Sequence, residues 1–282
     1  MDPLIINVCL TGAVSTKREN PHLPITQEEI IEDAHRVLSS GASMLHIHGR
    51  EPDGTPAWRP ERVAPVFEAI RKEHPHAVLV ATTTGRVFPD FEHRASVLAL
   101  DGQAKPDMAS LTLGSMNFPK SASVNSPQII ERLAGVMTDR GIRPELEIFE
   151  TGMLHYARYL MRKGVLPAFC YANFLLGSLG TTPARMLDLA LLVRDLPEGW
   201  VWAGAGIGKY QLFMNGAAVV MGGHVRVGLE DNLFFDRQKQ ISATNPMLVE
   251  RVVRIAEAFG RKIATQEEAR AILKLNAPSF SL

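Results

Sequence analysis

Cysteine is scarce in this sequence, which contains only Cys9 and Cys170 among its 282 residues. Both fall within apolar runs predicted to be buried strands, so we expect packed thiols in a reducing, cytoplasmic environment and no disulfide. The formal net charge is zero, because 30 lysines and arginines balance 30 aspartates and glutamates. This balance gives no basis for a nucleic acid or an anionic membrane as a partner.

Long apolar runs and a secretion signal are missing as well. No stretch of about 20 apolar residues occurs, so no membrane span is expected. The N-terminus has neither a basic segment nor a small-residue cleavage site, and it is predicted to be a strand rather than a signal peptide. Hydrophobic residues still make up 46% of the chain, which is enough to build a sizeable core.

The chain does contain a regular alternation of short apolar runs with amphipathic helical segments. This alternation predicts an α/β protein with a single (β/α)8 TIM-barrel catalytic domain over residues 1–282, since no linker or change of composition marks a boundary. An open, doubly wound sheet stays the alternative, because periodicity does not show whether a sheet closes. The predicted strands are residues 4–10, 44–48, 78–82, 107–113, 146–149, 168–174, 200–203 and 217–222.

Two helix starts carry local signals. Residues 26–29, Thr-Gln-Glu-Glu, form a capping-box pattern before a helix that Gly41 ends. Thr182 and Pro183 supply an N-cap and a first-turn proline for a helix predicted to run to residue 194. A further helix is predicted over residues 209–215, directly before the eighth strand.

His46 and His48 end the second predicted strand. Residues two apart in a strand face the same side, so both imidazoles can reach one ion. Gly49 places them at the carboxyl-terminal mouth of the barrel, where active sites of this fold lie. Two histidines suit zinc and leave room for a carboxylate and an open coordination position. The alternative is a pair of polar histidines at a strand end, without a metal.

A second dense segment, residues 222–232, follows the predicted eighth strand. It places Arg226, Glu230 and Asp231 at the same mouth as the two histidines. One of two adjacent carboxylates can bind a metal while its neighbour acts as a base. His224 also has the spacing of a third ligand, and a solvated charged loop is the alternative interpretation of the whole segment.

These motifs resemble the β-keto acid cleavage enzymes, a family whose founding activity is 3-keto-5-aminohexanoate cleavage in lysine fermentation. The most specific element is GGHVRVGLED, paired with LHIH, and the similarity runs over nearly the whole chain. The supporting stretches are TGAVSTKRENPHLPITQEEI, PDMASLTLGSMNF, RPELEIFETGM and YANFLLG.

The resemblance implies zinc held by His46, His48 and Glu230, with Asp231 as the general base and Arg226 beside it. The implied reaction joins a β-keto acid to acetyl-CoA and releases acetoacetate and a new acyl-CoA by retro-Claisen cleavage. The family resemblance also suggests a homotetramer.

Further site residues are implied by the same resemblance. Thr82, where the family often has serine, preserves a hydroxyl, and Gly85 and Ser110 match positions in the substrate pocket. Glu147 matches a further acidic site residue, for which Glu145 and Glu150 are competing candidates.

One departure from the family bears on the substrate. The resemblance implies a comparison with the lysine-fermentation enzyme, in which an acid after the first strand binds the ammonium of the substrate. This chain has Val14 at that position. Desolvating an unpaired ammonium against valine would be unfavourable. We therefore expect a neutral or apolar β-keto acid, unless Lys17, Arg18 or Glu19 reaches into the pocket.

A phosphate site is needed for CoA, and a glycine-rich segment offers one. Gly206, Gly208 and Lys209 follow the predicted seventh strand and open a helix, near the place where barrels often bind phosphate. The segment lacks the spacing and the Ser/Thr of a P-loop. A glycine turn with a purely structural role is the alternative.

Two other functions stay open at this stage. A metal-dependent barrel hydrolase also begins with two histidines at a strand end, but it usually needs further His or Asp ligands from later strands. A non-catalytic barrel that keeps its metal for structure is the other possibility, against which the presence of Asp231 and Arg226 argues.

Overall fold

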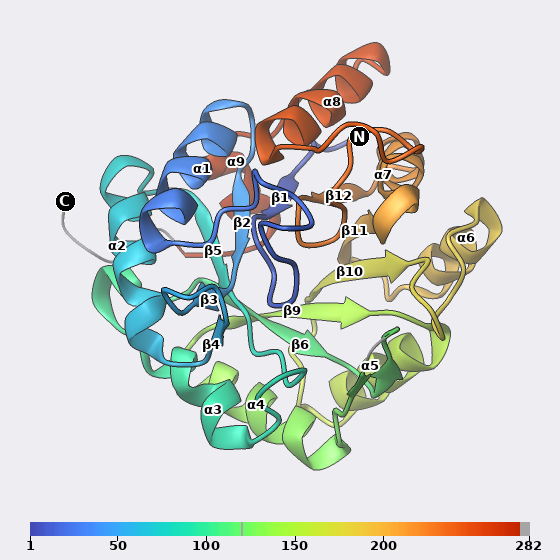
Figure 1. The fold of residues 1–282 in the computed structure, drawn as a ribbon. Helices are drawn as coiled ribbons and strands as arrows, with labels where there is room; N and C mark the ends of the chain where they lie inside the picture. The colour runs from blue at the N-terminus through green and yellow to red at the C-terminus, as the bar shows by residue number, and fades with distance from the viewer. Residues whose placement is uncertain (120, 277–282) are drawn as a thin grey trace.

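The computed structural model, which describes residues 1–119 and 121–276, is a closed barrel of eight parallel strands (Figure 1). The order around the barrel is β1-β12-β11-β10-β9-β6-β5-β2, which confirms the predicted barrel and rules out the open sheet. The strands are β1 (Ile6–Cys9), β2 (Met44–Ile47), β5 (Val78–Ala81), β6 (Met108–Thr112), β9 (Arg143–Ile148), β10 (Tyr171–Leu176), β11 (Val201–Gly206) and β12 (His224–Val227).

Helices surround this barrel and cover its outer face (Figure 1). The capping box is confirmed, because the Thr26 side chain accepts from the Glu29 amide and the Glu29 side chain accepts from the Thr26 amide. Among the described residues, no helix has the length and apolar content needed to cross a membrane. The helices are α1 (Gln27–Ser39), α2 (Ala64–Glu73), α3 (Phe91–Ala95), α4 (Pro127–Asp139), α5 (Thr151–Arg162), α6 (Met186–Asp195), α7 (Gln211–Val220), α8 (Asn245–Ala258) and α9 (Gln266–Ile272).

Short elements extend several strand-to-helix connections. Two hairpins follow β2 and β6, one 3₁₀ turn precedes each of α2 and α7, and two further 3₁₀ turns lie between α3 and β6. These elements are β3 (Gly49–Arg50) with β4 (Pro56–Ala57), β7 (Met116–Asn117) with β8 (Ala122–Ser123), η1 (Pro60–Arg62), η2 (Ser96–Ala99), η3 (Gly102–Ala104) and η4 (Gly208–Tyr210).

The predicted eighth strand is wrong. Residues 217–220 belong to α7, and the eighth strand is β12, which lies inside the segment thought to follow it. The reason is that α7 packs closely against β11 and β12 and buries Met214, Ala218 and Val219. A helix that is apolar on most of its surface has the same sequence pattern as a buried strand.

The start of α6 is also three residues later than predicted. Thr182 is not its N-cap, because the Thr182 amide donates to Phe149 O and the Thr182 carbonyl accepts from the Gly177 amide. These two hydrogen bonds hold the segment in an irregular conformation, and the helix begins only after Arg185. Tertiary hydrogen bonds have overridden a local capping signal here.

A buried polar contact ties together two loops at the mouth of the barrel. The Asn245 side-chain amide donates to Leu10 O and to Asp33 Oδ2, at 2.9 and 2.6 Å, while its oxygen accepts from the Leu229 amide at 2.8 Å. Leu10 ends the first strand run and Leu229 precedes Glu230. The contact therefore fixes the relative position of the loops after β1 and β12.

We expect Asp33→Asn to stabilise the fold above pH 6. Burial raises the pKa of Asp33 to about 6, and the Asn245 hydrogen bond only partly opposes this. Because the folded pKa exceeds the unfolded value, ionisation costs stability progressively as pH rises from about 4 to 6, by up to about 3 kcal/mol. Urea unfolding of both proteins should give equal stability near pH 4 and a gain for the variant at pH 7.5. A variant that is less stable at pH 7.5 would contradict this assignment.

Candidate active site and metal centre

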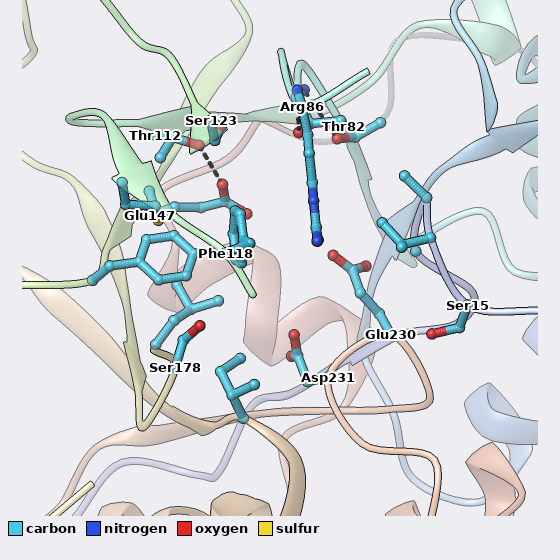
Figure 2. Close-up of a pocket in the computed structure, with 18 of the residues that line it drawn as sticks. Ser15, Thr82, Arg86, Thr112, Phe118, Ser123, Glu147, Ser178, Glu230 and Asp231 are labelled. Atoms are coloured by element: carbon cyan, nitrogen blue, oxygen red, sulfur yellow. Dashed lines mark hydrogen bonds between the residues drawn. The ribbon is translucent and has the colours of Figure 1, made fainter. Parts of the chain in front are cut away.

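A cavity of about 370 Å³ opens at the carboxyl ends of the barrel strands (Figure 2). This volume lies in the range of about 300–1,000 Å³ that is typical of small-molecule sites. Polar groups gather at one end, whereas other parts of the wall are apolar. The polar lining residues are Ser15, His48, Thr82, Thr84, Arg86, Thr112, Ser123, Glu147, Ser178, Arg226, Glu230 and Asp231, and the apolar ones include Val14, Met116, Phe118, Phe149, Leu175, Leu179 and Ile207.

Three predicted ligand groups meet beside this cavity. His46 Nε2 lies 3.3 Å from His48 Nε2, and Glu230 Oε1 lies 3.3 Å from His48 Nε2. The remaining separation, from His46 Nε2 to Glu230 Oε2, is 3.9 Å. Bonds of about 2.0–2.1 Å in tetrahedral geometry place ligand atoms roughly 3.3 Å apart. The three side chains could therefore hold one metal ion between them.

Two further features of this group fit a metal site. His46 Nδ1 lies 2.7 Å from Glu145 Oε2, which fixes the ring so that Nε2 faces the other two ligands. Glu230 Oε2 is buried without a hydrogen-bond partner in the described part of the chain. A buried, unsatisfied carboxylate oxygen is costly unless something else binds it.

Close backbone approaches make room for Glu230. Gly228 has φ +144°, and a Cβ atom there would lie 2.2 Å from Cys9 O. Gly12 has φ +64°, and a Cβ atom there would lie 2.7 Å from Glu230 Cγ. Side chains at either glycine would push the loop after β12 away from β1, so these positions require glycine.

Glu145 supports His46 from the barrel interior. Its other oxygen, Oε1, accepts from the side-chain amides of Asn7 and Asn173, at 2.7 and 2.8 Å. Burial would raise the pKa of this carboxyl, but His46, Arg226 and Asn173 together lower it, so Glu145 is held as a carboxylate. Glu145 therefore orients His46, whereas the sequence had suggested it only as an alternative to Glu147 for the further acidic site residue.

We expect Glu145→Gln to weaken metal binding by roughly 10- to 100-fold, because the group that orients His46 is weakened while the metal ligands remain. Competition with a chromophoric chelator measures this affinity. Glu150→Gln is the matched control, since Glu150 caps α5 by accepting from the Gly152 amide. An unchanged affinity in Glu145→Gln would show that His46 needs no such support.

Arg226 connects the acidic groups of the site. Its guanidinium donates to Asp231 Oδ2 at 3.0 Å, to Glu230 Oε1 at 3.0 Å and to Glu147 Oε1 at 3.2 Å. Burial would lower the pKa of Arg226, but these carboxylates raise it well above its usual value. The result is a permanently charged centre that fixes three carboxylates at one end of the cavity.

Asp231 lies in the cavity wall next to the proposed ligands (Figure 2). Burial raises the pKa of Asp231, while the Arg226 guanidinium opposes the shift. A buried carboxylate that an arginine orients by hydrogen bonding is a suitable proton acceptor. Its backbone is fixed as well, since the Asp231 carbonyl accepts from the Gly208 amide at 2.7 Å.

The structure brings some, but not all, of the other predicted residues to the cavity. Val14, Thr82 and Glu147 line it, and Thr112 donates to Glu147 Oε2 at 2.6 Å. Ser110 and Gly85 do not line it in the described structure.

Ser110 and Gly85 instead support the loop after β5. The Ser110 hydroxyl accepts from the Thr83 amide at 3.0 Å, and the Thr83 hydroxyl donates to Ser110 O. A Cβ atom at Gly85 would lie 2.7 Å from Arg94 Nη1, so this glycine leaves space for a buried arginine. Both residues therefore act on the cavity through the position of this loop.

The glycine-rich segment is divided between two elements. Gly206 ends β11, whereas Gly208 and Lys209 lie in η4, and Ile207 between them lines the cavity. The predicted helix over residues 209–215 therefore begins later, at Gln211 in α7. Lys209 is exposed beside the mouth of the barrel.

His224 is not part of the ligand group. It begins β12 at the opposite end of the barrel, where its Nδ1 accepts from the Ile5 amide at 3.0 Å. Burial, with a further contribution from Arg261, lowers the pKa of His224 to about 3. The sequence-based alternative of a third histidine ligand is therefore wrong, because β12 runs between His224 and Glu230.

Arg86 and Thr112 are among the lining residues that sequence reasoning missed. Arg86 extends into the cavity from the loop after β5, and Thr112 ends β6 beside Glu147 (Figure 2). A polar residue at the end of a barrel strand is a usable signal for Thr112. Arg86 lies in an irregular loop, where spacing gives no indication of side-chain direction.

Comparisons with known proteins identify the family of the chain. A family model described as beta-keto acid cleavage enzyme matches residues 3–275. The chain is 40% identical to a 3-keto-5-aminohexanoate cleavage enzyme of Fusobacterium nucleatum, covering 98% of this chain and 99% of the relative. It is 38% identical to the 3-oxoadipate:acetyl-CoA acetyltransferase of Cupriavidus necator, over 99% and 97%. The solved ternary complex of ObcA with a C4-CoA adduct and oxalate shares the fold, with a TM-score of 0.80, 20% identity and coverage of 90% and 68%.

Proposed function

Because this chain belongs to the beta-keto acid cleavage enzyme family, we propose that it is an acetyl-CoA-dependent acyltransferase that converts a β-keto acid and acetyl-CoA into acetoacetate and a new acyl-CoA. The observation that carries the proposal is the position of Asp231 in the cavity wall, directly beside the group of His46, His48 and Glu230. A base next to an electrophilic centre suits removal of a proton between two carbonyls.

The metal in this proposal is zinc. Two imidazole nitrogens and one carboxylate oxygen are a ligand set that zinc accepts while keeping a position open for substrate. Bound there, zinc would supply Lewis acidity toward a carbonyl oxygen of the substrate. Among the described residues, no further histidine joins this group, which argues against the multi-histidine site of a barrel hydrolase.

Asp231 would begin the reaction by accepting the proton from the carbon between the keto and carboxylate groups. The resulting carbanion attacks the acetyl-CoA carbonyl and expels CoA thiolate. The thiolate then attacks the original keto carbon, the adjacent carbon–carbon bond breaks, and acyl-CoA forms. Asp231 returns its proton to the departing acetoacetate carbanion. Throughout, Arg226 keeps the Asp231 carboxylate directed at the cavity.

The substrate proposed from Val14 is a neutral or apolar β-keto acid. Val14 lines the cavity and is 43% exposed, and Phe118, Leu179 and Ile207 add further apolar surface. Lys17 does not contribute a charge there, because its Nζ pairs with Glu29 Oε1 on α1. Glu19 is likewise engaged, since its carboxylate accepts from Thr16.

The remaining parts of the proposal concern CoA, assembly and location. Gly206, Gly208 and Lys209 are proposed as CoA phosphate contacts, supported by their position at the mouth beside Ile207. A homotetramer is proposed from the resemblance alone. Free, buried Cys9 and Cys170 agree with the proposed cytoplasmic location.

The test is a panel of β-keto acids that differ in charge and chain length, each incubated with zinc-loaded protein and acetyl-CoA. We expect acetoacetate and the matching acyl-CoA in equal amounts, fastest for uncharged acyl chains. Formation of free acids without acetyl-CoA would indicate a hydrolase instead. No product from any acid would reject the proposed function, and a preference for cationic acids would reject the argument from Val14.

A further inference from the structure

Arg86 is the second guanidinium of the cavity, and its surroundings are unlike those of Arg226. Arg226 is fully enclosed by the carboxylates of Glu147, Glu230 and Asp231. Arg86 is half-buried, and in residues 1–119 and 121–276 no carboxylate lies within ion-pair distance of it. Its guanidinium carbon instead lies 4.0 Å from the centre of the Phe118 ring.

The position of Arg86 makes this unpaired charge relevant to a ligand. Thr82, Thr84 and Arg86 alternate along the loop after β5 and all line the cavity. Figure 2 shows Arg86 extending from the side of Thr82 toward Glu230. Burial lowers the pKa of Arg86, and the Glu230 charge, which lies beyond ion-pair distance, only partly opposes this. Stacking on the Phe118 ring fixes the direction of the guanidinium. The cavity thus presents a positioned cation with free donors.

We propose that Arg86 binds a carboxylate of the β-keto acid. The inference rests on the proposed function, in which the acid occupies the space between the metal ligands and the loop after β5. The carboxylate has two sources: the C1 carboxylate that every β-keto acid carries, which is compatible with a neutral acyl chain, or a second carboxylate at the far end of the acyl chain, which would replace the neutral chain proposed from Val14. Arginine suits either, because its planar fork matches a carboxylate with two parallel hydrogen bonds.

A phosphate of CoA is the less suitable partner for Arg86. The proposed phosphate contacts follow β11, and β5 lies four strands away from β11 in the eight-stranded ring. Arg86 is therefore on the opposite side of the barrel mouth from the glycine-rich segment. Its guanidinium also extends toward Glu230, where the reacting carbons are expected, rather than toward the outer rim.

The test compares wild-type protein with Arg86→Met, Arg86→Lys and the surface control Arg36→Met on α1. The acids are 3-oxohexanoate, which ends in a methyl group, and 3-oxoadipate, which ends in a second carboxylate. Steady-state kinetics gives kcat and the KM for each acid and for acetyl-CoA. Calorimetric binding of each acid to the zinc-loaded protein without acetyl-CoA gives a readout that is independent of turnover.

We expect Arg86→Met to raise the KM and the Kd of the acid by roughly 10- to 100-fold, with kcat and the KM for acetyl-CoA changed less than about twofold. An effect on both acids identifies the C1 carboxylate, and an effect on 3-oxoadipate alone identifies a second carboxylate. Arg86→Lys should recover part of the loss, and Arg36→Met should behave as wild type.

Two results would overturn this role for Arg86. Unchanged acid binding in Arg86→Met would show that no carboxylate contacts Arg86. A rise confined to the KM for acetyl-CoA would assign Arg86 to a CoA phosphate. Failure of the proposed function is distinguishable from both, because the wild-type protein would then form no acetoacetate from any acid.

Discussion

Asp231→Asn is expected to lower kcat by roughly 10²- to 10⁴-fold, the usual contribution of a positioned general base. The amide cannot accept the substrate proton, but its oxygen can still accept from Arg226 Nε, which lies 3.0 Å from Asp231 Oδ2. The metal ligands are untouched, so zinc content should equal that of the wild type. The measurement is initial-rate acetoacetate formation together with metal analysis of the same sample.

A matched control distinguishes a catalytic effect of Asp231→Asn from a general effect of removing one carboxylate. Asp188→Asn removes a carboxylate that pairs with Arg185 on the outer helix α6, away from the cavity. Its activity should stay within about twofold of the wild type, because Asp188 does not line the cavity. Near-normal activity in Asp231→Asn would mean that another group takes the proton.

His48→Ala is expected to have the largest effect on metal binding. It removes one of three ligands whose donor atoms lie 3.3–3.9 Å apart, so affinity should fall by more than the roughly 10- to 100-fold expected for a supporting residue such as Glu145. Turnover should fall with it. Zinc titration followed by thermal unfolding reports binding without any substrate, since a ligand that binds only the folded state raises its stability.

The control for His48→Ala is His76→Ala. His76 lies in the His74-Pro75-His76 segment, which has the same spacing as the ligand pair but is partly exposed after α2. Zinc should raise the melting temperature of the wild type and of His76→Ala, and it should raise that of His48→Ala far less. An equal rise in all three proteins would place the metal elsewhere.

The local signals that succeeded are those that depend on neighbouring residues alone. The Thr26 capping box is satisfied within four residues, and β2 brings His46 and His48 to one side because alternate residues share a face. Residues 217–222 and Thr182 show the limit of such signals. Their conformations depend on contacts with β11, β12 and Phe149, which are distant in the sequence.

The sequence by itself determined the barrel class, the histidine pair and the family, because these follow from periodicity and from contiguous motifs. Only the tertiary structure separated Glu145 behind His46 from Glu147 in the cavity, excluded His224, and revealed Arg86. These distinctions depend on how strands from both ends of the chain close into one ring. The closed ring places Glu230 beside the histidine pair and leaves His224 at the other end of β12. It also places the Arg86 charge in the cavity beyond ion-pair distance of any carboxylate in the described residues.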